Sequence, residues 1–123
     1  MTIIAHSKGG LIAKLVMATP QGARRIRLTV AVSTPFGGSA YARYFPVPSV
    51  RALSPTDAAL LRLDAERDAN ARIVSVYGWF DPHIPGGSEL VGARNVRLPV
   101  GGHFRILAKR PLLDVVDECL ARE

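Results

Sequence analysis

The sequence contains only one cysteine, Cys119, among its 123 residues, which excludes an internal disulfide and a cysteine-rich zinc site. It also lacks an apolar run of about 18 residues, which a transmembrane helix would need. Residues 1–5 lack the basic start and the apolar centre of a secretory signal. These absences predict a chain with no membrane-spanning helix and no export signal, with the cytoplasm as the default location.

Basic residues outnumber acidic ones, which raises binding to nucleic acid or to an anionic surface as one hypothesis. Sixteen Lys and Arg against ten Asp and Glu give a formal net charge of +6. Most of the basic residues stand singly, and the densest group, residues 24–27, lies between an expected helix and an expected strand. We therefore expect a solvated basic surface and no nucleic-acid partner, with a basic binding module as an alternative.

The hydrophobic pattern predicts a single α/β domain over residues 1–123, with a parallel sheet of about four strands and flanking helices. Four mostly apolar segments are typical of strands. They are residues 1–5, 28–32, 73–77 and 95–100.

Three helices are expected around this sheet. One runs from Lys8 to Ala18, and the last begins at Pro111. Their apolar stripes are Leu11, Ile12, Leu15 and Val16 in the first, and Leu112, Val115, Val116 and Cys119 in the last. The third helix, which ends near Asn70, is indicated by Ser54 as N-cap, Pro55 at the first position and Asp57 completing the capping box.

Ser7 lies where the first expected strand turns directly into the first helix. The small residues Ala5 and Gly9 flank it, as is needed where a strand and a helix nearly touch. A serine hydroxyl is a poor nucleophile unless a histidine takes its proton and an acid orients that histidine. Asp81 and His103 each follow a later strand, so all three side chains are expected at the carboxyl edge of one sheet.

This pattern resembles the α/β-hydrolase fold and, within it, the serine esterases and lipases. The resemblance rests on Ala5-His6-Ser7-Lys8-Gly9-Gly10, Ser33-Thr34-Pro35-Phe36-Gly37-Gly38-Ser39, Asp81-Pro82-His83-Ile84-Pro85 and Gly102-His103-Phe104. These segments run through nearly the whole chain in the family's order of Ser, Asp and His. The resemblance implies a catalytic triad of Ser7, His103 and Asp81 that hydrolyses carboxylic esters without a cofactor or a metal.

The resemblance also assigns an oxyanion hole and a lid. The backbone N–H of Lys8 would supply one donor to the oxyanion hole, and the family's other donor belongs to a loop before the elbow strand, for which this sequence has no residues. Residues 36–70 would form a lid-like insertion. Its aromatic residues, which either bind substrate in an acyl pocket or cover the sheet edge, are Tyr41, Tyr44 and Phe45.

The missing segment has two expected consequences. Loss of one oxyanion donor lowers turnover by roughly 10²–10³ in a serine hydrolase, so a catalytically incompetent hydrolase fragment is the main alternative. The absent strands would also leave the edge of residues 1–5 and part of the first helix uncovered, and we expect self-association through that apolar edge.

Four other residues near the triad have simpler interpretations. His83 lies only two residues from Asp81, so a contact between them would be local, and His6 is expected to point away from the site. No His-x-x-x-His or His-x-His spacing is present, so we expect no metal site. Trp79 and Phe80 are expected to pack around the acid loop. Because the base would be a histidine, activity should fall below a pH of about 6–7.

Overall fold

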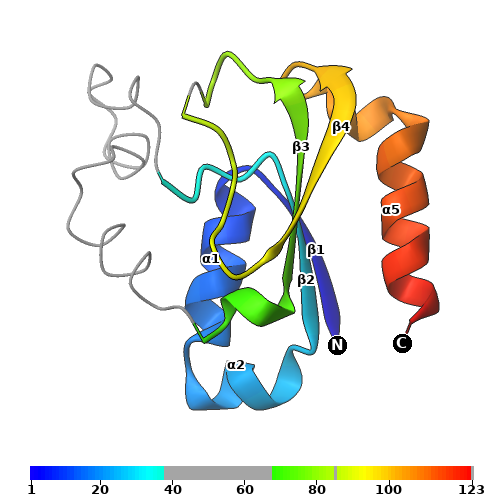
Figure 1. Ribbon diagram of the computed structural model, residues 1–123. Coiled ribbons are helices and arrows are strands. Elements are labelled where there is room, and N and C mark those ends of the chain that lie inside the picture. Colours follow the sequence, from blue (N-terminus) through cyan, green and yellow to red (C-terminus); the bar gives the residue numbers. More distant parts are fainter. Residues whose placement is uncertain (38–67, 85, 123) are drawn as a thin grey trace.

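The computed structural model describes residues 1–37, 68–84 and 86–122, which are built around one parallel sheet (Figure 1). The strands lie in the order β1-β2-β3-β4, and every neighbouring pair is parallel. Their bounds are Thr2–His6 for β1, Leu28–Val32 for β2, Ile73–Phe80 for β3 and Arg94–Gly101 for β4. The fold class is therefore α/β, as the hydrophobic pattern predicts.

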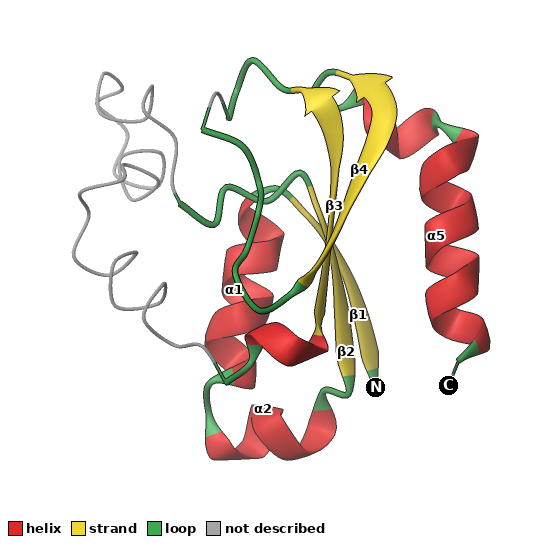
Figure 2. Ribbon diagram, in the orientation of Figure 1, coloured by secondary structure: helices red, strands yellow, loops and turns green. Residues whose placement is uncertain are grey.

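Helices cover both faces of this sheet. The helix α1 (Lys8–Met17) lies on one face and α5 (Arg110–Ala121) on the other (Figures 1 and 2). Two short 3₁₀ helices, η2 (Asn70–Arg72) and η3 (Arg105–Ala108), precede β3 and α5 respectively. Within the described parts of the chain, none of the helices is both long enough and apolar enough to cross a membrane.

A second helix on the α1 side, α2 (Pro20–Arg25), is not predicted by the sequence analysis. The Thr19-Pro20 pair is interpreted there only as the end of α1. In the structure it also begins α2, because the Thr19 hydroxyl accepts a hydrogen bond of 3.0 Å from the Gly22 N–H and Pro20 occupies the first turn. The densest basic group therefore begins in the last turn of this helix.

Each face of the sheet carries its own hydrophobic cluster. The cluster beside α1 consists of Leu11, Met17, Ile26, Ala31, Phe36, Ala69, Ile73 and Leu90. The cluster beside α5 consists of Val30, Val32, Val74, Val76, Leu98, Ile106, Leu112, Val115 and Cys119. The two inner strands β2 and β3 contribute to both clusters, which explains their mostly apolar sequences. Burial also raises the pKa of the Cys119 thiol, so this cysteine acts as a small core residue.

The apolar stripe expected on α1 is partly wrong, whereas that of α5 is confirmed by the burial of Leu112, Val115 and Cys119. On α1 the buried side chains include Leu11, Lys14 and Met17. The exposed ones are Ile12 at 55%, Leu15 at 58% and Val16 at 43%. Because this helix is apolar on more than one side, its sequence alone does not show which side faces the sheet.

The edge strand β1 comes directly before α1 in the sequence, and its own side chains are also only partly covered. Ile4 is 53% exposed, and β1 pairs only with β2 among the described strands. Unpaired backbone groups and uncovered apolar side chains at a sheet edge favour contact with another chain. Self-association through this edge remains a prediction.

Most of the expected lid-like insertion lies outside the described residues. This holds for the candidate substrate-binding residues Tyr41, Tyr44 and Phe45, and for the capped helix expected from Ser54.

Candidate active site

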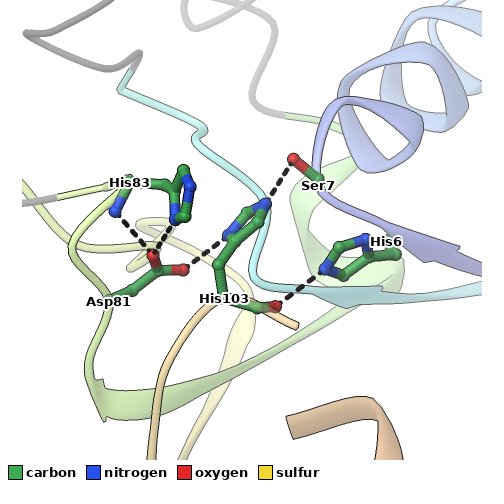
Figure 3. A network of polar contacts seen from close by, with 5 residues as sticks. All are labelled: His6, Ser7, Asp81, His83 and His103. Atoms are coloured by element: carbon green, nitrogen blue, oxygen red, sulfur yellow. Dashed lines mark hydrogen bonds and ion pairs between the residues drawn. The ribbon is translucent and has the colours of Figure 1, made fainter. Parts of the chain in front are cut away.

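The three predicted site residues all follow strands of the parallel sheet. Ser7 comes directly after β1, Asp81 directly after β3, and His103 two residues after β4. Because the strands run in one direction, their carboxyl ends share an edge, and Figure 3 shows the three side chains in line there. The structure therefore brings together the residues that the sequence analysis selected.

A continuous hydrogen-bond relay joins these side chains. The His103 Nε2 lies 2.9 Å from the Ser7 Oγ, and the His103 Nδ1 lies 2.7 Å from the Asp81 Oδ2. An ionised carboxylate only accepts hydrogen bonds, so Nδ1 carries the proton and donates it to Asp81. In this neutral tautomer Nε2 accepts the bond from the Ser7 hydroxyl and is placed to take its proton.

Ser7 has a backbone conformation that few non-glycine residues adopt. Its φ is 55° and its ψ is −126°, and its N–H donates to the Val32 carbonyl at 2.8 Å. A Cβ at Gly9 would lie 3.4 Å from the Ala5 Cβ, in van der Waals contact, so the strand and the helix approach closely on the two sides of the turn. Such a conformation costs about 1–3 kcal/mol and recurs at functional sites.

This strain predicts an inverted order of stability at position 7. The variants Ser7→Gly and Ser7→Ala both lose the hydroxyl, but only glycine relaxes the positive φ. At an ordinary position alanine is more stable than glycine by about 0.4–1 kcal/mol. Here we expect Ser7→Gly to exceed Ser7→Ala by about 0.5–2 kcal/mol in the free energy of unfolding, measured in urea. A more stable alanine variant would show that the turn holds no strain.

The loop that carries His103 has to turn back across the sheet. β1 and β4 lie at opposite edges, so their axes are about 14 Å apart at the usual strand spacing. Gly102 makes this reversal with a φ of 101°, a conformation that L side chains rarely adopt, and its N–H donates to the Phe80 carbonyl at 2.7 Å. The fully buried Ile106 then anchors the segment after the histidine in the core.

His6 holds the other side of this loop, which corrects the expectation that it points away from the site. Its Nε2 lies 2.9 Å from the His103 carbonyl oxygen, and since a carbonyl only accepts, His6 donates this bond (Figure 3). The ring of Phe104 contacts both histidines: its centroid lies 4.9 Å from that of His103, in an edge-to-face arrangement, and 5.3 Å from that of His6. Sequence spacing gives no signal for the two contacts of His6, because they join residues almost a hundred positions apart.

The relay is largely shielded from water while the nucleophile stays accessible. The side chains of His103 and Asp81 are only 6% and 8% exposed, whereas Ser7 is half-buried. Hydrogen bonds between charged and polar groups strengthen when water is excluded. Lys8 follows Ser7 and begins α1, so its backbone N–H lies at the helix N-terminus, where the helix dipole stabilises negative charge.

His83 contacts the second oxygen of the acid. Its backbone N–H donates to the Asp81 Oδ1 at 2.9 Å, and its ring Nδ1 lies 3.7 Å from the same oxygen. The side chain is 60% exposed. The contact is local, as expected, but the His83 ring also lies 4.8 Å from that of His103. Asp81, His83 and His103 thus form a group of possible metal ligands, which a search for local spacing misses because β3 and β4 bring it together.

The aromatic residues before the acid do not pack as expected. Trp79 and Phe80 are 61% and 54% exposed. They help line a hollow of about 430 Å³ that also reaches Asp81, and neither Ser7 nor His103 lines it. Of the three residues in the relay, only Asp81 lines this hollow.

No protein-family model matches the chain, and comparison with curated proteins also gives no match. The family resemblance therefore rests on residues of this chain. The arrangement of Ser7, His103 and Asp81 is the feature from which a function can be inferred.

Proposed function

We propose that the chain is a serine hydrolase of the α/β-hydrolase type that cleaves carboxylic esters. The observation that carries this proposal is the relay of 2.9 Å from Ser7 to His103 and 2.7 Å from His103 to Asp81. A base within hydrogen-bond reach of a hydroxyl, oriented in turn by an acid, is the arrangement that activates serine as a nucleophile. The strained conformation of Ser7 adds support, because it sets the hydroxyl at the tip of a sharp turn.

The reaction proceeds by acyl transfer in two halves. The Ser7 Oγ attacks the ester carbonyl carbon while the His103 Nε2 takes the hydroxyl proton, and the Lys8 N–H stabilises the negative charge on the carbonyl oxygen. His103 then gives the proton to the leaving alcohol as the C–O bond breaks, which leaves an acyl group on Ser7. Water attacks this acyl-enzyme with His103 again as base, and the acid is released. Asp81 stays ionised and stabilises the imidazolium form of His103.

The alternative is that the chain has the same fold and triad but hydrolyses esters only slowly. Lys8 is the one oxyanion donor that we assign among the described residues, and removal of one such donor typically costs about 10²–10³ in rate. This alternative predicts an activated serine whose reaction with esters is slow.

Ester hydrolysis by matched serine variants tests the proposal. We expect Ser7→Ala to lower turnover of a short-chain p-nitrophenyl ester by at least about 10³-fold, because the nucleophile is lost. Ser33 is the control, since it also has a positive φ, of 49°, and is buried, but its Oγ has no hydrogen-bond partner among the described residues. Ser33→Ala should keep turnover within about twofold, as expected for a residue outside the relay. Equal turnover by both variants would contradict the assignment of Ser7.

A further inference from the structure

Asp81, His83 and His103 form a cluster in which each residue can offer one ligand atom to a metal ion. These atoms all lie within 4.8 Å of one another. A tetrahedral zinc ion with bonds of about 2.0–2.1 Å to N and O holds its ligand atoms about 3.4 Å apart. The cluster must therefore contract by about 1.4 Å at its widest, and the exposed side chain of His83 can supply this movement.

The donor set and its exposure both suit zinc. Two imidazoles and one carboxylate, with a water as fourth ligand, match the three-ligand sites that zinc occupies in proteins. Asp81 and His103 are held near one another by their burial. Zinc would replace the proton of their 2.7 Å hydrogen bond, so these two ligand atoms must move apart to about 3.4 Å. His83 is 60% exposed, so an ion can enter from solvent on its side.

We propose that Asp81, His83 and His103 bind a zinc ion, and that this ion switches off the serine nucleophile. The switch, unlike the binding, rests on the proposed hydrolase function. In the working tautomer the His103 Nδ1 carries the proton and Nε2 accepts from Ser7. Zinc at Nδ1 displaces that proton, which passes through solvent to Nε2 of the neutral ring. Nε2 then donates instead of accepting, so it no longer takes the Ser7 proton.

Calorimetric titration of the full chain with ZnCl₂, in the Ser7→Ala background, tests the binding without relying on activity. We expect one zinc ion per chain at micromolar concentrations. His83→Ala should weaken zinc binding by at least about tenfold, because the loss of even a group that only hydrogen-bonds to a metal ligand typically lowers metal affinity by that factor. Asp114→Asn is the control, because it also removes a carboxylate but lies on α5, outside the ligand cluster, and it should bind zinc as the parent chain does. Binding that survives His83→Ala, or that is absent from the parent chain, overturns the site.

The switch is tested on the chain with Ser7 intact, by its rate of labelling with a fluorophosphonate. Zinc should slow labelling by at least tenfold, EDTA should restore it, and His83→Ala should label at the same rate with and without zinc. Labelling that zinc does not affect, in a chain that binds zinc, overturns the switch but not the site. Absence of labelling in every variant, together with zinc binding that depends on His83, refutes the hydrolase function and leaves the metal site intact.

Discussion

Asp81→Asn is expected to lower ester turnover by about 10⁴-fold while the chain keeps its fold. The Asp81 Oδ2 accepts the 2.7 Å hydrogen bond from the His103 Nδ1 and so keeps the proton on that nitrogen. An asparagine amide can donate to Nδ1, which favours the tautomer with its proton on Nε2. That nitrogen then points a hydrogen at the Ser7 hydroxyl and no longer acts as its base.

The control for this variant is Asp114→Asn. Asp114 pairs with Arg110 one turn away on α5, and its side chain is 63% exposed. Loss of an exposed pair of this kind changes stability by only a few tenths of a kcal/mol, so turnover should not change. Steady-state kinetics on both purified variants make the comparison. A loss of less than about tenfold for Asp81→Asn would mean that the acid does not set the histidine tautomer.

Gly78→Ala is expected to damage both stability and the site. A Cβ at position 78 would lie 2.1 Å from the Val100 carbonyl oxygen, so β3 and β4 would have to separate. Overpacking of this kind costs about 1–3 kcal/mol in the free energy of unfolding. Because Asp81 and His103 follow these two strands, their hydrogen bond should lengthen, and a displacement of about 1 Å can cost 10²-fold in turnover.

The sign of the change in stability distinguishes a steric clash from the usual effect of replacing glycine with alanine. Alanine in a strand is normally more stable than glycine, so a loss of stability at position 78 identifies the contact with Val100 as its cause. Gly86→Ala is the control, since a Cβ there meets nothing within 4 Å. In urea that variant should be at least as stable as the parent, by up to about 1 kcal/mol, and its ester turnover should be unchanged. A Gly78→Ala variant as stable and active as Gly86→Ala would contradict the close packing of β3 against β4.

The sheet could be predicted from sequence because β1, β2 and β3 each contain a mostly apolar run that is rich in β-branched residues. β2 begins and ends where the sequence analysis placed it, at Leu28 and Val32. β3 runs three residues beyond the predicted end at Tyr77 and passes through Gly78, a residue that weakens a strand pattern. The structure explains this glycine by its contact with Val100, which sequence periodicity does not show.

The meeting of Ser7, Asp81 and His103 could be predicted because it follows from topology. Parallel strands bring their carboxyl ends to one edge, so a polar residue after each strand is placed near the others. The supporting contacts follow from the path of the loops instead. His6 bonds to the His103 carbonyl, and the rings of His83 and His103 approach one another, because Gly102 turns the last loop back across the sheet.

The side of α1 that faces the sheet could not be inferred for a different reason. Its sequence offers apolar residues around most of the helix, so the apolar pattern fits more than one orientation. The structure buries Lys14 and leaves Leu15 exposed, the reverse of what hydrophobicity favours. The choice is made by packing against β1 and β2, not by the helix itself.

Mapping of a fluorophosphonate adduct by peptide mass spectrometry is the most direct measurement of an activated serine. The relay predicts one adduct per folded chain, on Ser7, and no adduct after unfolding in urea or in the His103→Ala variant. Equal labelling of the folded and unfolded chains, or an adduct on any other serine, would contradict it.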